Sequence, residues 1–172
     1  MNTGDDAATP SPQEVALWFP LNLVRIERVP WWAARWLADG YEGEDLRELA
    51  GLDDSDPRAI RDLVPLVLAE MQVQVAPTLL AAARQAFRYV AQQRSSGRAD
   101  ERWVLQQVES IVVATGYDDQ ILDLPLGEVF HLSDAWNEPW GPPLEELKAS
   151  IRTRCSEQLN ASAVTSGRAD ST

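Results

Sequence analysis

The sequence predicts a mainly α-helical fold, an irregular multi-helix bundle around a central antiparallel helical hairpin. Apolar residues recur at spacings of three and four along residues 78–94 and again along 99–115, which is typical of helices that bury one face. A short Ser-Ser-Gly turn at 95–97 joins these segments, so the two helices should lie antiparallel. The 172 residues are 45% hydrophobic and 24% charged, an ordinary globular composition, and we expect a single helical domain over residues 13–160.

Each helix of the hairpin carries an apolar stripe that should form the centre of the core. The first stripe consists of Leu79, Leu80, Ala83, Phe87, Val90 and Ala91. The second consists of Val104, Val108, Ile111, Val112 and Thr115. A last helix over residues 144–159 has a similar stripe, made of Leu144, Leu147, Ile151, Cys155 and Leu159. Residues at these spacings share one side of a helix and can pack together.

Shorter helices are predicted before the hairpin from their start and stop signals. Residues 13–19 follow a serine and a proline that fit the N-cap and the first helical position. Residues 30–39 begin with proline and are followed by glycine, and residues 44–50 are also followed by glycine, a common helix stop. An Asp-Pro pair opens a further helix over residues 58–71, in which Pro65 should kink or break the helix.

Two segments leave room for one small β element. The apolar residues of 21–29 fit neither a period of two nor a period of 3.6, so strand and helix both stay open. Residues 128–132 could form a short strand, although the surrounding segment 126–135 reads as helical. A short element is also expected at 121–124, and two prolines at 142–143 open the last helix.

The ends of the sequence have a different composition from the rest. Residues 1–12 and 161–172 are small, polar and aperiodic, so we expect disordered tails at both ends. The first of these segments lacks the apolar stretch of a secretory signal peptide. No segment offers the roughly 20 apolar residues that a membrane-spanning helix needs. A cytoplasmic protein without a membrane segment is therefore expected.

The net charge of −12 is unevenly distributed. Residues 1–56 hold 12 acids against 4 bases and residues 116–172 hold 10 against 4, whereas residues 57–115 hold 5 against 7. Nucleic-acid binding normally needs a basic surface that displaces counterions from the phosphates. Acidic flanks instead favour solubility and attract basic partners. The charge pattern therefore favours a protein partner over nucleic acid.

Compact motifs for phosphate binding and nucleophilic catalysis are missing from the sequence. Neither the glycine-rich phosphate loops nor the Gly-x-Ser-x-Gly elbow occurs. The acidic run at 53–56 invites comparison with a calcium loop, but Arg58 and Val64 stand where such a loop needs glycine and glutamate. We expect these acids to start the following helix instead, and we expect no metal and no cofactor.

The single histidine and the single cysteine are the remaining candidates for chemistry. Glu128, His131 and Asp134 are spaced three apart, so on a helix His131 could act as a base held by a carboxylate. A lone histidine is more often structural. Cys155 lies on an apolar stripe, where a buried thiol packs as a small hydrophobe. We assign no catalytic residue, and the sequence favours a non-enzymatic protein.

Seven tryptophans are the strongest functional signal in the sequence. Trp32 and Trp36 lie one turn apart on the predicted 30–39 helix, while Trp31 points about 100° away from Trp32, so a single buried stripe cannot hold all three. Tryptophan is enriched at binding hot spots, although core packing is the alternative role. Nearby acids are Glu27, Asp39, Glu42, Asp134 and Glu138. The predicted partner-binding residues are Trp31, Trp32, Trp36, Asp39, Glu42, Trp136, Glu138 and Trp140.

Together these features predict a non-enzymatic interaction protein that holds a protein partner, of basic character, on an acidic, tryptophan-bearing surface. An inhibitor, an immunity-type protein, an adaptor or an assembly factor would fit. The alternative is a DNA-binding regulator with a degenerate helix-turn-helix at about 44–64, in which Arg58 and Arg61 open the recognition helix. The aspartates of that turn would repel phosphates. The alternative also needs the arginines of the middle segment to converge on one face.

Overall fold

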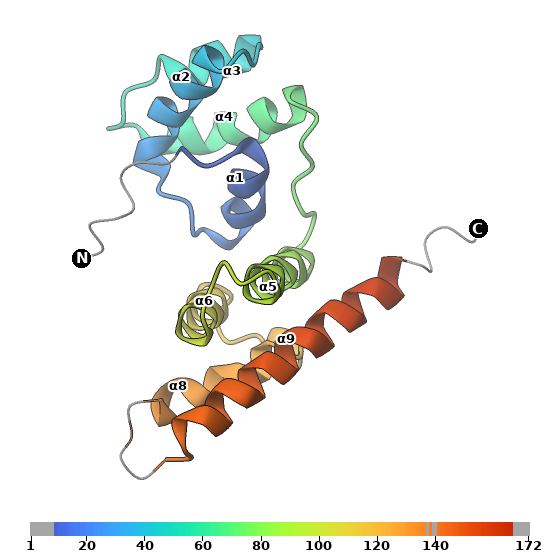
Figure 1. Cartoon of the computed structure of the whole chain (residues 1–172). Coiled ribbons are helices and arrows are strands. Elements are labelled where there is room, and N and C mark those ends of the chain that lie inside the picture. Colours follow the sequence, from blue (N-terminus) through green and yellow to red (C-terminus); the bar gives the residue numbers. More distant parts are fainter. Residues whose placement is uncertain (1–8, 137, 139–140, 167–172) are drawn as a thin grey trace. The chain divides into compact units, whose positions relative to one another are not determined.

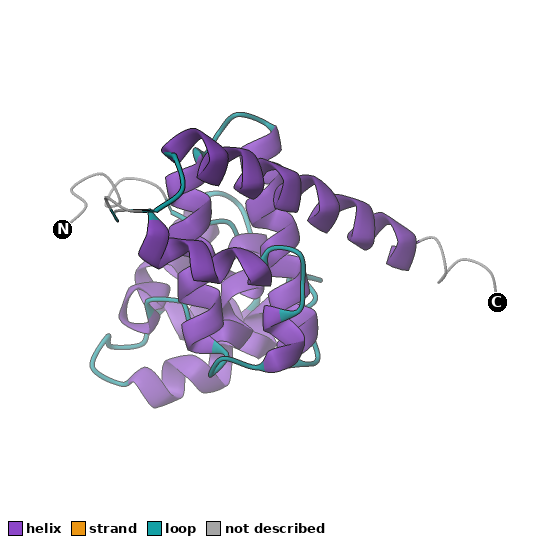
Figure 2. Ribbon diagram, turned by 90° about the horizontal axis from the view of Figure 1, so that it is seen from below, coloured by secondary structure: helices purple, strands orange, loops and turns teal. Residues whose placement is uncertain are grey.

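The computed structural model describes residues 9–136, 138 and 141–166, with side chains up to residue 161. The described chain is mainly α-helical, as predicted, and contains no strand (Figures 1 and 2). The small β element that the sequence left open is not present among the described residues. Residues 21–29 contain a 3-10 turn, η2 (Ile26–Arg28), and residues 128–132 fall largely in another, η3 (Gly127–His131).

The chain divides into two compact units, Met1–Ala76 (unit 1) and Pro77–Thr172 (unit 2), where the sequence suggested one domain. The predicted hairpin belongs to unit 2, and unit 1 has a hydrophobic core of its own. The last helix continues to Ser166, past the expected boundary at residue 160. Of the two predicted tails, residues 1–8 and 167–172 lie outside the described part of the chain.

Unit 1 is built from short helices whose starts follow the sequence signals. They are α1 (Pro12–Trp18), η1 (Phe19–Leu21), η2, α2 (Val29–Ala38), α3 (Glu44–Ala50) and α4 (Pro57–Glu70). The hydroxyl of Ser11 accepts a hydrogen bond from the Glu14 amide at 3.2 Å, and the Glu14 carboxylate accepts one from the Ser11 amide at 2.9 Å. Asp56 caps α4 by accepting from the Ala59 amide at 3.0 Å. The acidic run therefore starts a helix, as predicted.

The core of unit 1 explains why α4 is not broken by its internal proline. The buried residues of this core are Val15, Ala16, Ile26, Val29, Ala33, Trp36, Leu46, Leu49, Ile60, Val64, Val67 and Leu68. α4 contributes the last four of them and continues through Pro65, which is exposed. Proline inside a helix costs about 3 kcal/mol, and burial of each large aliphatic side chain returns roughly 1.5–3 kcal/mol. Packing therefore outweighs the local penalty.

The start of α3 is capped from a distance by the end of α4. The Glu70 carboxylate accepts hydrogen bonds from the backbone amides of Glu44 at 2.6 Å and Leu46 at 3.2 Å. Helix amino termini carry unsatisfied amides and partial positive charge, so a carboxylate there is favourable. Gly43 makes room for it, because a Cβ at residue 43 would lie 1.9 Å from the nearer Glu70 carboxylate oxygen.

Gly43→Ala should lower the free energy of unfolding by about 1–2 kcal/mol, because the methyl group displaces the capping carboxylate of Glu70. In a Glu70→Ala background the same change should have little effect, since the displaced group is already gone. Urea denaturation of the natural chain and the three variants of this cycle measures both values. Gly51→Ala is the control, because its added Cβ would meet no atom closer than 3.5 Å. Additive effects of the two substitutions would contradict the proposed displacement.

Unit 2 contains the predicted hairpin and the last helix (Figure 1). Its elements are α5 (Leu79–Ser95), α6 (Glu101–Ala114), α7 (Asp119–Leu122), η3, α8 (Leu132–Ala135) and α9 (Leu144–Ser166). The α6 stripe is buried throughout, as predicted. In the other two stripes the first residue is exposed rather than buried, and these residues are Leu79 and Leu144. Both stand at the first position of their helices, where a side chain can extend beyond the packed face.

Glu101 joins the three long helices of unit 2. Its buried carboxylate, at the start of α6, pairs with Arg94 of α5 and accepts a hydrogen bond from Arg152 Nε of α9 at 2.6 Å. Burial alone would raise the pKa of Glu101, but the hydrogen bonds from Arg152 and Arg94 outweigh burial and hold this pKa at about 2. The carboxylate is therefore ionised at neutral pH.

Because the pKa of Glu101 is lower in the folded chain, its ion pairs stabilise the fold fully above pH 4.5 and lose this effect as the pH falls toward about 2. The contribution is about 3 kcal/mol. Glu101→Gln should lower stability at pH 7 by about 2–4 kcal/mol and remove this part of the acid sensitivity. Urea denaturation between pH 7 and pH 3 measures both. The control Glu145→Gln removes an exposed pair with Lys148 and should change both far less.

Candidate partner-binding surface

The helical period of α2 places its tryptophans on different sides. Val29, Ala33 and Trp36 form the buried side, at spacings of four and three. Trp31 lies about 200° around the helix from Val29 and is 46% exposed, whereas Trp36 is 3% exposed. Trp32 is half-buried and packs against the core of unit 1. Of the three tryptophans on this helix, Trp31 is the one that presents a large surface to solvent.

Trp36 is a structural residue of unit 1. Its indole N–H donates a hydrogen bond to the backbone carbonyl of Pro10 at 2.9 Å. This bond satisfies the single polar atom of the buried ring and holds the segment before α1 against α2. Trp36 was among the predicted partner-binding residues, and the structure places it in the core, the alternative that the sequence left open.

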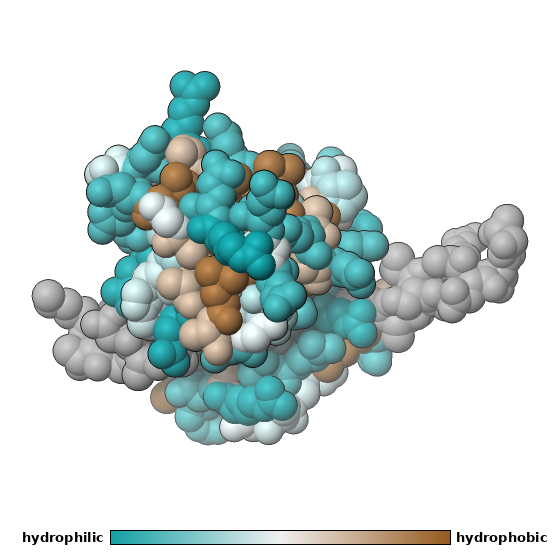
Figure 3. All heavy atoms as spheres, turned by 90° about the horizontal axis from the view of Figure 1, so that it is seen from above, coloured by the Kyte–Doolittle hydropathy of each residue, from teal (hydrophilic) through white to brown (hydrophobic). Residues whose placement is uncertain are grey.

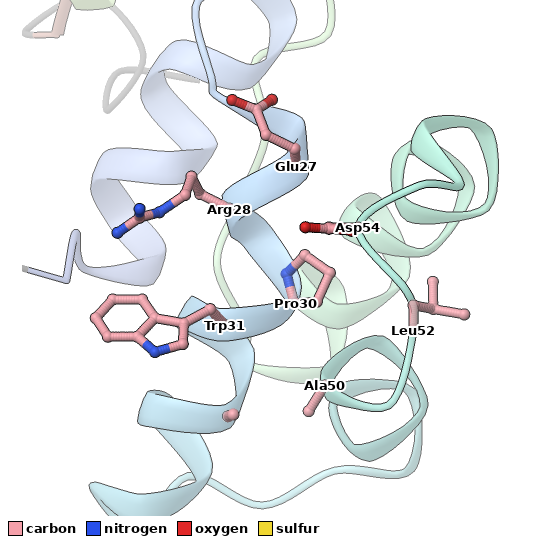
Figure 4. Close-up of a pocket in the computed structure, with 8 residues that line it drawn as sticks. Glu27, Arg28, Pro30, Trp31, Ala50, Leu52 and Asp54 are labelled. Atoms are coloured by element: carbon pink, nitrogen blue, oxygen red, sulfur yellow. The ribbon is translucent and has the colours of Figure 1, made fainter.

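Trp31 borders an open hollow of about 480 Å³ on the surface of unit 1. The lining residues are Glu27, Arg28, Pro30, Trp31, Ala34, Ala50, Leu52 and Asp54. One side comes from η2 and the start of α2, and the other comes from the end of α3 and the connection to α4. Arg28 and Trp31 lie together, and Ala50, Leu52 and Asp54 lie across from them, with Pro30 between (Figure 4).

Charged groups frame this hollow. The Arg28 guanidinium lies over the ring of Trp31, 5.3 Å from its centroid, in a cation–π arrangement. Glu27 and Asp54 are both exposed and add two carboxylates to the lining. The surface on the side of α2 and α3 is mostly hydrophilic and exposes a small apolar patch (Figure 3). Aromatic residues and arginine, both present in this lining, are enriched at protein interfaces.

The other predicted partner-binding residues are distributed over both units. Asp39 and Glu42 are exposed and follow α2 in unit 1. Trp136 is half-buried and Glu138 is exposed, and both belong to unit 2. Trp140 lies outside the described residues.

Several lining residues of the hollow were not predicted as site residues. Arg28 stands three positions before Trp31, a helical spacing that could have indicated the contact. Leu52 and Asp54 reach the hollow through the path of the α3–α4 connection, for which the sequence contains no pattern.

The side chains considered for chemistry, Cys155, Glu128 and His131, make contacts of a structural kind. Burial raises the pKa of the Cys155 thiol to about 11, so this cysteine stays protonated and a poor nucleophile. Glu128 pairs with Arg154 at 2.5 Å, and the ring of His131 packs edge-on against Phe130. Among the described residues, histidine, cysteine and acidic side chains do not gather in groups of three that could hold a metal ion.

The segment of the alternative helix-turn-helix forms α3 and α4, which are in contact. Arg61 donates a hydrogen bond to the side-chain oxygen of Asn22 at 2.7 Å. Asp53, Asp54 and Asp56 are exposed in the connection and at the start of α4. The DNA-binding alternative also needs arginines of the middle segment, and one of these, Arg94, is paired with Glu101.

No helix in the described part of the chain combines the length and the apolar character needed to cross a membrane. Comparisons of the chain with protein-family models, with curated proteins and with solved structures found no match.

Trp31→Ala should change the free energy of unfolding by less than about 1 kcal/mol, because it removes an exposed ring and one surface cation–π contact. Trp36→Ala should cost about 3–5 kcal/mol, because it empties a core position and leaves the Pro10 carbonyl without its donor. Chemical denaturation followed by circular dichroism compares the two. A large loss for Trp31→Ala would mean that this ring supports the fold rather than a binding surface.

Proposed function

We propose that this chain is a non-enzymatic interaction protein that binds a basic protein partner at the Trp31 hollow of unit 1. The observation that carries the proposal is the exposure of Trp31 at the edge of a hollow that two carboxylates also line. Burying a large apolar side chain contributes roughly 1.5–3 kcal/mol, and tryptophan is enriched among residues that dominate binding energy. Trp31 leaves nearly half of its surface exposed, and this exposed part is available to a partner.

The charge of unit 1 supports a basic partner. Residues 39–56, which surround and include α3, contain eight acids and one base. Most of these acids are exposed, and their segment continues into the lining of the hollow at Ala50, Leu52 and Asp54. An acidic field of this kind accelerates association with a basic surface and weakens as salt screens it.

In the proposed function the chain acts by forming a stoichiometric complex with its partner. An inhibitor, an immunity-type protein, an adaptor and an assembly factor all act by occupying a partner's surface, and all would use an exposed aromatic anchor with complementary charge. Cys155 and His131, the side chains first considered for chemistry, take no part in the proposed interaction.

The full chain, immobilised as bait, should retain a discrete protein from its native lysate at about 50 mM salt and lose it at about 500 mM salt. A bait carrying Trp31→Ala should fail to retain that protein, because the anchor is gone while the fold persists. The retained protein is then purified and titrated by calorimetry, with a 1:1 complex expected for the natural sequence. Retention that is equal on both baits, or indifferent to salt, would contradict the proposal.

A further inference from the structure

The Trp31 hollow has an apolar floor between two helices. Pro30 and Ala34 line this floor from α2. Ala50, the last residue of α3, lines it from the side of α3 (Figure 4). An alanine side chain ends at its first carbon, so the two alanines do not fill the space between their helices. The hollow of about 480 Å³ is therefore open above these short side chains.

The charged groups of the lining do not converge on this floor. In Figure 4 the Glu27 carboxylate points away from Pro30, and the Arg28 guanidinium points away from Ala50. Asp54 lies beyond Pro30, at the end of the hollow away from Ala50 (Figure 4). A charged ligand group beside the two alanines would lose water without meeting an opposite charge there, and such a loss is costly. The floor therefore favours an apolar group.

The floor continues on α2 into the exposed tryptophan. Ala34 follows Trp31 by three positions, so the two side chains are neighbours on the surface of the helix. Trp31 is 46% exposed, and Ala34 is exposed as well. An apolar side chain seated at Ala34 therefore lies beside the tryptophan ring, and its binding removes water from apolar surface on both residues.

From this geometry we infer that the hollow takes a large aliphatic side chain of the protein partner, an inference that rests on the proposed function. The side chain enters between α2 and α3 and contacts Pro30, Ala34 and Ala50. The partner residues on either side of it are basic, because residues 39–56, which surround and include α3, hold eight acids against one base. The recognised element is therefore an aliphatic residue flanked by basic residues in an exposed segment.

The inference is tested by nuclear magnetic resonance on the ¹⁵N-labelled full chain, titrated with acetyl-Lys-Leu-Lys-amide. The readout is the assigned backbone amide signal of Ala50. The leucine probe should shift this signal saturably, with a dissociation constant on the order of 10 mM for so small a ligand. Acetyl-Lys-Ala-Lys-amide should bind about fivefold more weakly, because its shorter side chain buries less apolar surface. Equal binding of the leucine and alanine probes would overturn the inference.

A substitution that fills the floor locates the bound side chain. Ala34→Leu should weaken binding of the leucine probe by about fivefold or more, because the new side chain occupies the same space. Ala34 is exposed and leucine is a good helix former, so α2 should keep its structure, which circular dichroism checks. Ala38→Leu is the matched control, because Ala38 is exposed on the same helix but does not line the hollow. Unchanged binding in Ala34→Leu, or an equal loss in both variants, would overturn the assigned position.

The outcomes separate this inference from the proposed function. If the bait retains a protein through Trp31 while the leucine probe binds no better than the alanine probe, the aliphatic side chain is wrong and the proposed function stands. If the leucine probe binds with the expected selectivity while no protein depends on Trp31 for retention, the hollow recognises an aliphatic side chain and the proposed function fails.

Discussion

A helix at the surface of a domain buries only one side, and this constraint on α2 determines how its tryptophans are exposed. Val29, Ala33 and Trp36 repeat at helical spacing, and their burial anchors α2 to the core. Once that side faces inward, the period of the helix forces Trp31 outward, whatever its hydrophobicity. The exposed ring is therefore a geometric consequence of packing its neighbour Trp36, and the hollow forms where the α3–α4 connection passes the same side of α2.

Local signals in the sequence predicted the helices well, because each signal corresponds to a hydrogen bond or a steric rule. Ser11 and Asp56 cap their helices as expected, and residues 44–50 form α3 with the predicted bounds. The strand alternative at 21–29 was wrong, because weak periodicity does not distinguish a strand from a chain of tight turns. Pro65 lies inside a helix, because the burial of other α4 side chains in the core outweighs the low helix propensity of proline.

The organisation of the chain beyond single helices was harder to predict from the sequence. An apolar stripe predicts that a helix face is buried but does not name the surface that covers it, so the division at Ala76 and Pro77 had no sequence signal. The same limit applies to the candidate site. The tryptophan pattern drew attention to α2, but the separate roles of Trp31 and Trp36 depended on which stripe faces the core, and the contribution of Asp54 depended on a loop path.

The acidic side chains of the protein fall into two physical groups, which a simple count of charges does not distinguish. Some carboxylates, such as those of Glu70 and Asp56, end at backbone amides of helix starts, where partial positive charge offsets their own. Others, such as those of Glu27 and Asp54, line the surface hollow. The first group is constrained by architecture and the second by whatever the surface must recognise. Divergent versions of this chain could therefore keep the same skeleton of capping acids while the acids of the hollow vary with the partner.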